Sequence, residues 1–153
     1  MNLPAPERLR PWTVYCDGSA MPNPGRLGLG AVITQPDGTR HTLSQATHTT
    51  GCNNEAELRA LTLALEALRA RGATSVRAYS DNSILVEQLS AADARPIARL
   101  APLFDDARAL LGAFEEASVQ WIPRHRNAEA DALARAALGF APKPAAKAWK
   151  KRR

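Results

Sequence analysis

The sequence predicts an α/β domain in which a mixed five-stranded sheet carries helices on both faces. Three strand-like segments separated by turn-forming residues open the chain, and segments of helical and strand periodicity then alternate. The expected order of elements is βββαβααβα. Because strands linked through helices run parallel, we expect three antiparallel strands followed by two parallel ones. With 153 residues, of which 45% are apolar, the chain can build one core.

The first strand is expected at 12–16, after a loose lead-in at 1–11 that holds three prolines. A proline-containing loop separates it from a second strand at 28–34, and the two are expected to pair as a hairpin. The turn residues Pro-Asp-Gly-Thr then lead to 40–47, whose weak alternation is typical of an edge strand.

The clearest helix is expected at 54–71, where leucines recur at steps of three and four residues and Gly72 provides a C-terminal stop. Its apolar stripe requires a sheet to cover. One domain over residues 12–140 is therefore expected. Its remaining elements are a strand at 75–80, helices at 82–91 and 97–114, a strand at 119–122 and a helix at 127–138.

Positive charge is concentrated at the end of the chain. Residues 143–153 carry six of the twenty basic residues and no acidic one, whereas 1–142 holds fourteen arginines against fifteen acidic residues. Without an apolar stripe to pack, the segment 141–153 is expected to be a disordered basic tail. Such a tail suits a polyanionic partner. A solubilising end or a nuclear-localisation-like patch is the alternative.

No run approaches the roughly 18 apolar residues of a membrane span, and residues 1–7 have neither a basic end nor an apolar stretch. We therefore expect a cytoplasmic monomer with no membrane partner. Cys16 and Cys52 match no zinc spacing and are expected to be reduced thiols.

Four acidic residues stand at the boundaries of separate predicted elements: Asp17, Glu57, Asp81 and Asp131. Carboxylate oxygens are the ligands that Mg²⁺ and Mn²⁺ prefer. Two such ions held about 3.5–4 Å apart activate a water and stabilise the leaving oxygen of a phosphodiester. The set therefore predicts a metal-dependent nuclease.

Each acid also has an ordinary structural explanation. Asp17 precedes a glycine, as in a turn. Glu57 stands three residues after Asn54, as in a capping box. Asp81 and Asp131 occupy positions where an acid favours a helix start.

The joint position of the four acids favours a metal site instead. Asp17 and Asp81 both end predicted strands, and ligands of open α/β sheets gather at the carboxyl ends of strands. If these strands are parallel neighbours, the two carboxylates lie side by side, and the helix starts at Glu57 and Asp131 face them. Four acids in one place repel one another unless cations neutralise them.

Four motifs, in the same order, resemble those of the type 1 ribonuclease H family over about residues 12–138. The family shows Asp-Gly-Ser and Asn-Pro-Gly in its first hairpin and Asn-Asn-x-x-Glu-Leu at the head of its first helix. It also shows Ser/Thr-Asp-Ser/Asn after its fourth strand and a tryptophan strand followed by Asn, Glu and Asp-x-Leu-Ala. The matching residues are Asp17-Gly18-Ser19, Asn23-Pro24-Gly25, Asn53-Asn54-Glu55-Ala56-Glu57-Leu58, Ser80-Asp81-Asn82, Trp121, Asn127, Glu129 and Asp131-Ala132-Leu133-Ala134.

The resemblance implies an endoribonuclease that hydrolyses the RNA strand of RNA–DNA hybrids. It implies two Mg²⁺ ions, for which Mn²⁺ is a possible substitute, that align a water for in-line attack and leave 5′-phosphate and 3′-hydroxyl ends. The implied metal ligands are Asp17, Glu57 rather than Glu55, Asp81 and Asp131.

The same resemblance assigns substrate contacts. Asn23, Asn53, Asn54 and the Gly18 backbone would contact the minor groove, where 2′-hydroxyls distinguish RNA from DNA. For the three asparagines, turn geometry and helix capping are alternatives that are compatible with substrate contact.

His125 aligns with the family's mobile histidine, which assists proton transfer or product release, and an imidazole suits that work. A surface histidine with no role is the alternative, and Arg124 or Arg126 would then substitute for it.

One residue and one segment depart from the family pattern. Cys52 stands where many members have a threonine that holds a DNA-strand phosphate, and a thiol is the weaker donor. Residues 83–114 contain no lysine, so the lysine-rich protrusion of many bacterial members is absent. The basic tail is the expected substitute. Its expected contacts are Lys147, Trp149, Lys150, Lys151, Arg152 and Arg153.

Three rival functions can be compared with the sequence, and two of them are disfavoured by it. A non-catalytic nucleic-acid-binding module on this fold would have lost at least one metal carboxylate, and all four are present. A nuclease of double-stranded RNA shares the metal chemistry and stays open. A nucleotide-binding enzyme is disfavoured because the glycines at 28–30 lack a following glycine and no Walker lysine is present.

Overall fold

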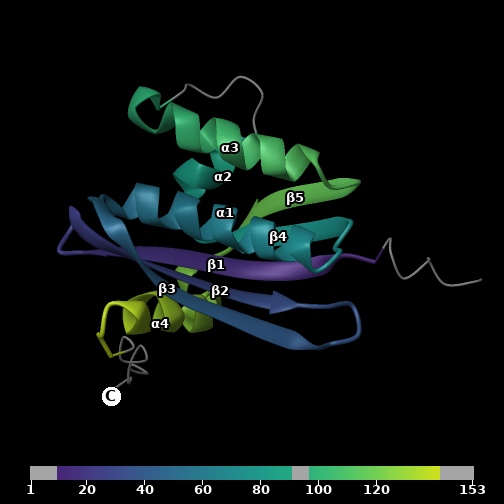
Figure 1. The fold of residues 1–153 in the computed structure, drawn as a ribbon, viewed down its shortest axis with the longest axis horizontal. Coiled ribbons are helices and arrows are strands. Elements are labelled where there is room, and N and C mark those ends of the chain that lie inside the picture. Colours follow the sequence, from purple (N-terminus) through teal and green to yellow (C-terminus); the bar gives the residue numbers. More distant parts are fainter. Residues whose placement is uncertain (1–9, 91–96, 142–153) are drawn as a thin grey trace, which may run out of the picture.

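The computed structural model describes residues 10–90 and 97–141, and it contains the predicted mixed five-stranded sheet (Figure 1). The strands lie in the order β3-β2-β1-β4-β5. The first three are antiparallel, and β4 runs parallel to both β1 and β5, as expected. Their bounds are β1 Trp12–Met21, β2 Gly25–Thr34, β3 Arg40–Gly51, β4 Ser75–Ser80 and β5 Glu116–Trp121.

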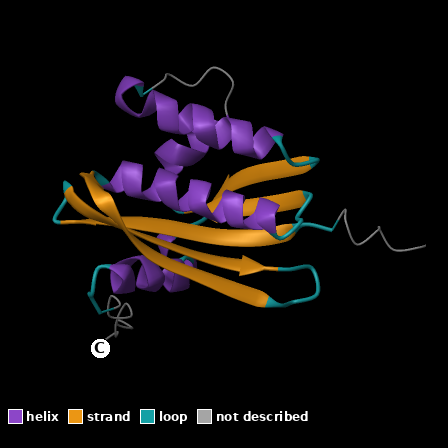
Figure 2. Ribbon diagram, viewed as in Figure 1, coloured by secondary structure: helices purple, strands orange, loops and turns teal. Residues whose placement is uncertain are grey.

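Helices cover both faces of the sheet, which confirms the predicted fold class (Figure 2). Three helices lie on one face, and α4 packs against β1, β2 and β3 on the other. Two short 3₁₀ turns, η2 and η3, precede α3 and α4. The bounds are α1 Asn53–Ala70, α2 Ser83–Ser90, η2 Ala98–Leu100, α3 Ala101–Gly112, η3 Arg124–Arg126 and α4 Ala128–Ala137.

The leucine stripe of α1 forms the centre of the core, as its spacing predicts. Leu58, Leu61, Leu65 and Leu68 are fully buried and belong to one hydrophobic cluster with residues of β1, β2 and β4. Burying such a side chain stabilises the fold by about 1.5–3 kcal/mol. This packing holds the start of α1 against the sheet.

The first hairpin is longer than predicted, and the expectation that Asp17 ends a strand is wrong. β1 continues to Met21, and Asp17 lies inside it, opposite Gly30 of β2. The reason is the close packing of helix α1 against this part of the strand. A Cβ atom on Gly18 would lie 2.2 Å from the carbonyl carbon of Ala56 in α1, so this glycine allows a helix to approach the strand instead of forming a turn.

The second half of the chain also shifts relative to the predicted elements. Pro102 lies in the first turn of α3, where a missing N–H costs least, so the predicted helix at 97–114 is divided into η2 and a shorter α3. β5 begins at Glu116 rather than at 119, because its exposed edge position allows polar residues to pair with β4.

Three predicted features lie wholly or partly outside the described residues. They are residues 1–9 of the lead-in, the end of the predicted helix at 82–91, and the tail contacts from Lys147 to Arg153. Within the described ranges, the helices are too short or too polar to cross a bilayer.

Candidate functional site

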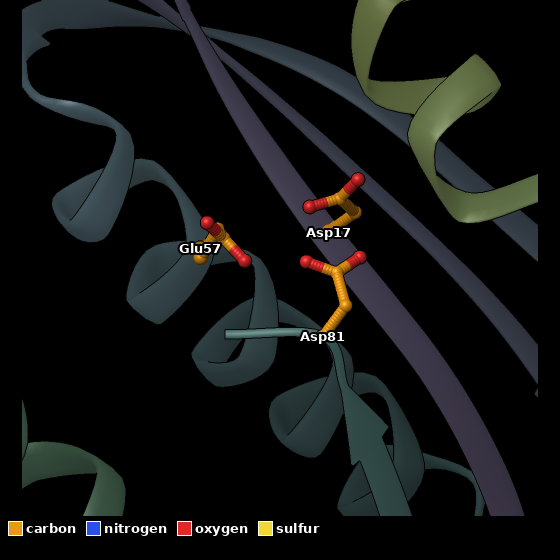
Figure 3. A group of neighbouring side chains, drawn as sticks. All are labelled: Asp17, Glu57 and Asp81. Atoms are coloured by element: carbon orange, nitrogen blue, oxygen red, sulfur yellow. The ribbon is translucent and has the colours of Figure 1, made fainter. Parts of the chain in front are cut away.

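Asp17 of β1, Glu57 of α1 and Asp81, which follows β4, converge at one place (Figure 3). One carboxylate oxygen from each residue lies within 4.8 Å of the others. The register explains the approach of the two aspartates. Tyr15 of β1 pairs with Tyr79 of the parallel strand β4, and each aspartate follows its tyrosine by two residues. The condition on which the sequence argument depended, that the two strands are parallel neighbours, is therefore met.

Burial and mutual repulsion disfavour the charged forms of these acids. Asp17 is only 7% exposed. Burial, followed by the charges of Glu57, Asp81 and Asp131, raises the pKa of Asp17 to about 9. Burial and the charge of Asp81 raise the pKa of Glu57 to about 7. A divalent cation bound among these acids would offset this repulsion and favour their charged forms.

The donor set fits a divalent cation. The Oε1 atom of Glu57 is buried and has no hydrogen-bond partner in the described part of the chain. A buried acceptor without a donor is costly, and a metal ion satisfies it. Asp17, Glu57 and Asp81 offer hard oxygen ligands in one place, and Asp131 in the first turn of α4 adds a fourth carboxylate nearby.

The acids line a small open cavity of about 140 Å³, which we call the carboxylate cavity. Two arginines share it with the acids, as do Gly18 and Asn53 of the predicted substrate-binding set. Its lining residues are Asp17, Gly18, Ser19, Asn53, Glu57, Asp81, Arg124, Asp131 and Arg135.

Two of the capping roles considered for the acids are absent from the structure. The Oδ1 atom of Asn82 accepts the backbone N–H of Leu85 at 3.1 Å, so Asn82 rather than Asp81 caps α2. The N-cap of α1 is Cys52, and no side chain caps that helix. Asn82 instead donates to Asn54 at 2.7 Å and to Oε2 of Glu57 at 3.2 Å. The Asn82 amide thus links the Glu57 carboxylate to Asn54, a predicted substrate contact.

Asn127 is a site residue to which the sequence analysis assigned no role, although it belongs to a family motif. It is 1% exposed, and its Nδ2 group donates to Oδ2 of Asp81 and to the carbonyl oxygen of Cys16, both at 2.9 Å. Asn127 is the N-cap of α4, yet its side chain makes no capping bond. An asparagine before a helix is normally taken as a cap, so the available signal pointed to another role.

Asn23 and Asn53 connect the first hairpin to α1. The Oδ1 atom of Asn53 accepts the backbone N–H of Ala20 at 2.8 Å, and that of Asn23 accepts the backbone N–H of Asn53 at 3.2 Å. These bonds use the side-chain oxygens and leave the NH₂ groups as donors. A structural role and substrate contact are therefore compatible for both residues.

A guanidinium lies beside Cys52. Both terminal nitrogens of Arg99 lie 3.5 Å from its Sγ atom. Burial opposes ionisation of this thiol, but the backbone N–H of Glu55 and the Arg99 guanidinium outweigh it and lower the pKa of Cys52. The position where the family has a threonine thus carries a neighbouring cation. Cys52 and the buried Cys16 are both free thiols.

The three residues of η3 face different surroundings. Arg124 lines the carboxylate cavity. Arg126 lines a second cavity of about 220 Å³, here called the rear cavity, which also includes Asn127. His125 is exposed and lines neither cavity. The other lining residues of the rear cavity are Tyr15, Val32, Thr34, Arg40, Glu129 and Ala130.

The strand order, the helices on both faces and the carboxylates beyond the paired ends of β1 and β4 define a domain of the ribonuclease H-like class. The model of the Reverse transcriptase-like family matches residues 15–137. Among solved structures, RNase H1 from the archaeon Halobacterium salinarum is 32% identical, with a TM-score of 0.79 over 85% of this chain and 98% of that one. The chain therefore belongs to the type 1 ribonuclease H family.

Two further relatives show the extent of the similarity. LC11-RNase H1, solved in complex with an RNA/DNA hybrid, is 30% identical, with a TM-score of 0.76 over 84% of this chain and 96% of that one. The bifunctional protein Rv2228c of Mycobacterium tuberculosis is 34% identical over 135 residues, which make up 87% of this chain. The present chain spans only 37% of that curated relative.

Proposed function

We propose that this protein is an endoribonuclease that hydrolyses the RNA strand of RNA–DNA hybrids and leaves 5′-phosphate and 3′-hydroxyl ends. The observation that carries the proposal is the convergence of Asp17, Glu57 and Asp81, with Asp131 lining the same cavity. Family membership supports the substrate, since LC11-RNase H1 was solved with a bound hybrid.

Asp17, Glu57, Asp81 and Asp131 would hold two divalent ions, with Mg²⁺ as the expected metal and Mn²⁺ as a substitute. Bound there, such ions activate a water for in-line attack and neutralise the negative charge that develops on the phosphodiester. The protein's own part is to hold the carboxylates in place. Asn82 does so for Glu57, and Asn127 does so for Asp81.

Substrate contacts are proposed on both sides of the carboxylate cavity. The Gly18 backbone would contact the minor groove, and the NH₂ groups of Asn23, Asn53 and Asn54 would donate to its 2′-hydroxyls and base edges. Cys52, together with Arg99, would hold a phosphate of the DNA strand, because the guanidinium supplies the donors that a thiol lacks. The basic residues of 143–153 would add phosphate contacts.

The test is cleavage of a labelled RNA–DNA hybrid in parallel with single-stranded RNA, double-stranded RNA and a DNA duplex. Each substrate is incubated with Mg²⁺, Mn²⁺ or EDTA, and Asp17→Asn serves as the inactive control. Metal-dependent cutting confined to hybrid RNA, and lost in the variant, supports the proposal. Tight binding without cutting would indicate a binding module, and cutting of double-stranded RNA would reassign the substrate.

A further inference from the structure

We propose that Arg124, and not His125, is the basic side chain that contacts the scissile phosphate in this protein. The inference rests on the proposed function and assigns the place of the family's mobile histidine to a neighbouring residue. It also changes the chemistry of that place, because a guanidinium keeps its protons under conditions in which an imidazole exchanges them.

The geometry of η3 separates the two side chains. A 3₁₀ helix has about three residues per turn, so successive side chains point about 120° apart. Arg124 accordingly lines the carboxylate cavity, Arg126 lines the rear cavity, and His125 lines neither.

The turn is held firmly at both ends. The backbone N–H of Arg126 donates to the carbonyl of Pro123 at 2.9 Å, and that of Asn127 donates to the carbonyl of Arg124 at 3.0 Å. The buried Asn127 side chain then anchors the turn to β1 and to Asp81. Arg124 and His125 therefore leave the turn in different directions while η3 keeps this conformation.

Arg124 is also the cavity cation that is available to a ligand. Ion pairs with an acid engage Arg40, Arg59 and Arg108, none of which lines this cavity. Arg135, the other cation of the cavity, donates through Nε to the carbonyl of Ala141 at 2.9 Å. The positive charge of Arg124 reaches the carboxylates, since it opposes the rise in the pKa of Glu57.

A phosphodiester gains negative charge on its oxygens as a water attacks it. A guanidinium offers paired N–H donors in a plane that suits two phosphate oxygens. Arg124 would therefore stabilise charge on the phosphate during attack and on the terminal phosphate of the product. It would neither take nor give a proton.

The experiment compares Arg124→Ala and Arg124→Lys with His125→Ala and Arg126→Ala, all at exposed positions of one turn. Steady-state kcat and KM are measured on a hybrid, Mg²⁺ affinity is measured by calorimetry, and folding is checked by thermal melting. Removal of a charge stabiliser predicts a fall in kcat of at least about 10-fold for Arg124→Ala. Arg124→Lys should recover part of this loss, and the other two variants should stay within about 2-fold of the parent.

Three outcomes would overturn the inference while leaving the proposed function intact. The first is an Arg124→Ala variant as active as the parent. The second is a loss of kcat in His125→Ala that equals or exceeds that in Arg124→Ala. The third is a loss of Mg²⁺ affinity that accounts for the whole fall in kcat, because Arg124 would then act on the metal centre. A parent protein that does not cut the hybrid rejects the proposed function and this inference together.

Discussion

The Nδ2 atom of Asn127 lies 2.9 Å from Oδ2 of Asp81 and also donates to the Cys16 carbonyl of β1. One buried amide thus joins the start of α4 to the strand that carries Asp17 and to the carboxylate that follows β4. Helix α4, which lies on the opposite face from α1, is thereby connected to the position of Asp81, a proposed metal ligand.

Replacement of Asn127 by alanine should weaken both the fold and metal binding. The change leaves the Cys16 carbonyl and one Asp81 oxygen without their donor, which costs about 2 kcal/mol of unfolding free energy. Urea unfolding and Mg²⁺ calorimetry measure the two effects, and Gln120→Ala, an exposed amide on β5, is the control. Unchanged Mg²⁺ affinity in a folded Asn127→Ala protein would argue against the positioning role.

Asp17→Asn should lose cleavage by at least about 100-fold, the loss seen when one electrostatic stabiliser is removed. In EDTA at pH 8 the same variant should melt at a higher temperature than the parent, because Asp17 is buried among three other acids. Differential scanning calorimetry with and without Mg²⁺ checks both parts. A lower melting temperature in EDTA would contradict the proposed repulsion.

The metal-free protein should lose stability as the pH rises. In the unfolded chain, Asp17 and Glu57 release their protons near the ordinary values of 3.8 and 4.5, but in the folded protein each pKa is raised, to about 9 and about 7. The folded state therefore binds more protons between these limits. Its extra stability is complete below about pH 4 and is lost as the pH passes 7 and then 9.

The loss should exceed the ~1.4 kcal/mol that one pKa unit represents. Urea unfolding in EDTA from pH 5 to 9 measures it, and Mg²⁺ should restore stability at the alkaline end. Asp17→Asn provides the comparison, since its profile should be flatter. A parent profile that rises with pH would show that the carboxylates are ionised in the metal-free fold.

Arg99→Ala should weaken hybrid binding and lower the salt dependence of the affinity by about one unit of slope, as expected for one lost phosphate contact. Arg69→Ala is the matched control, because Arg69 lies in the last turn of α1, whereas Cys52 precedes the first turn. Fluorescence anisotropy measures the hybrid affinity of both variants at salt concentrations from about 50 to about 200 mM, where phosphate contacts make affinity strongly salt-dependent. Equal slopes for the two variants would remove Arg99 from the phosphate site.

Deletion of 143–153 removes six basic residues and no acidic one. If the tail contacts phosphates, the deletion should reduce the salt slope of hybrid binding by several units, at about 0.9 per contact, and should leave kcat on saturating hybrid unchanged. Anisotropy and single-turnover cleavage separate these quantities. The same affinity and slope in the truncated protein would leave the tail without a role in binding.

Much of the site was visible before the structure because its chemistry is local in the sequence. The leucine spacing of α1, the edge character of β3 and the parallel relation of β1 and β4 all follow from patterns within single segments and from the rules for connecting them. Asp17, Glu57 and Asp81 each lie within a short sequence motif that resembles one of the family, and the motif identifies them as candidate site residues. The error at Asp17 arose because Asp-Gly favours a turn locally, whereas pairing with β2 and the approach of α1 keep the strand extended.

The sequence by itself determined the fold class, the family resemblance and the four carboxylates, because periodicity and short motifs report burial and chemistry along the chain. Tertiary structure decided which neutral and basic groups meet them. Asn127 contacts Asp81 across 46 residues, and Arg99 contacts Cys52 across 47. The turn of η3 decides whether Arg124 or His125 faces the cavity. Such contacts depend on how helices pack and where turns point, and no local pattern encodes those distances.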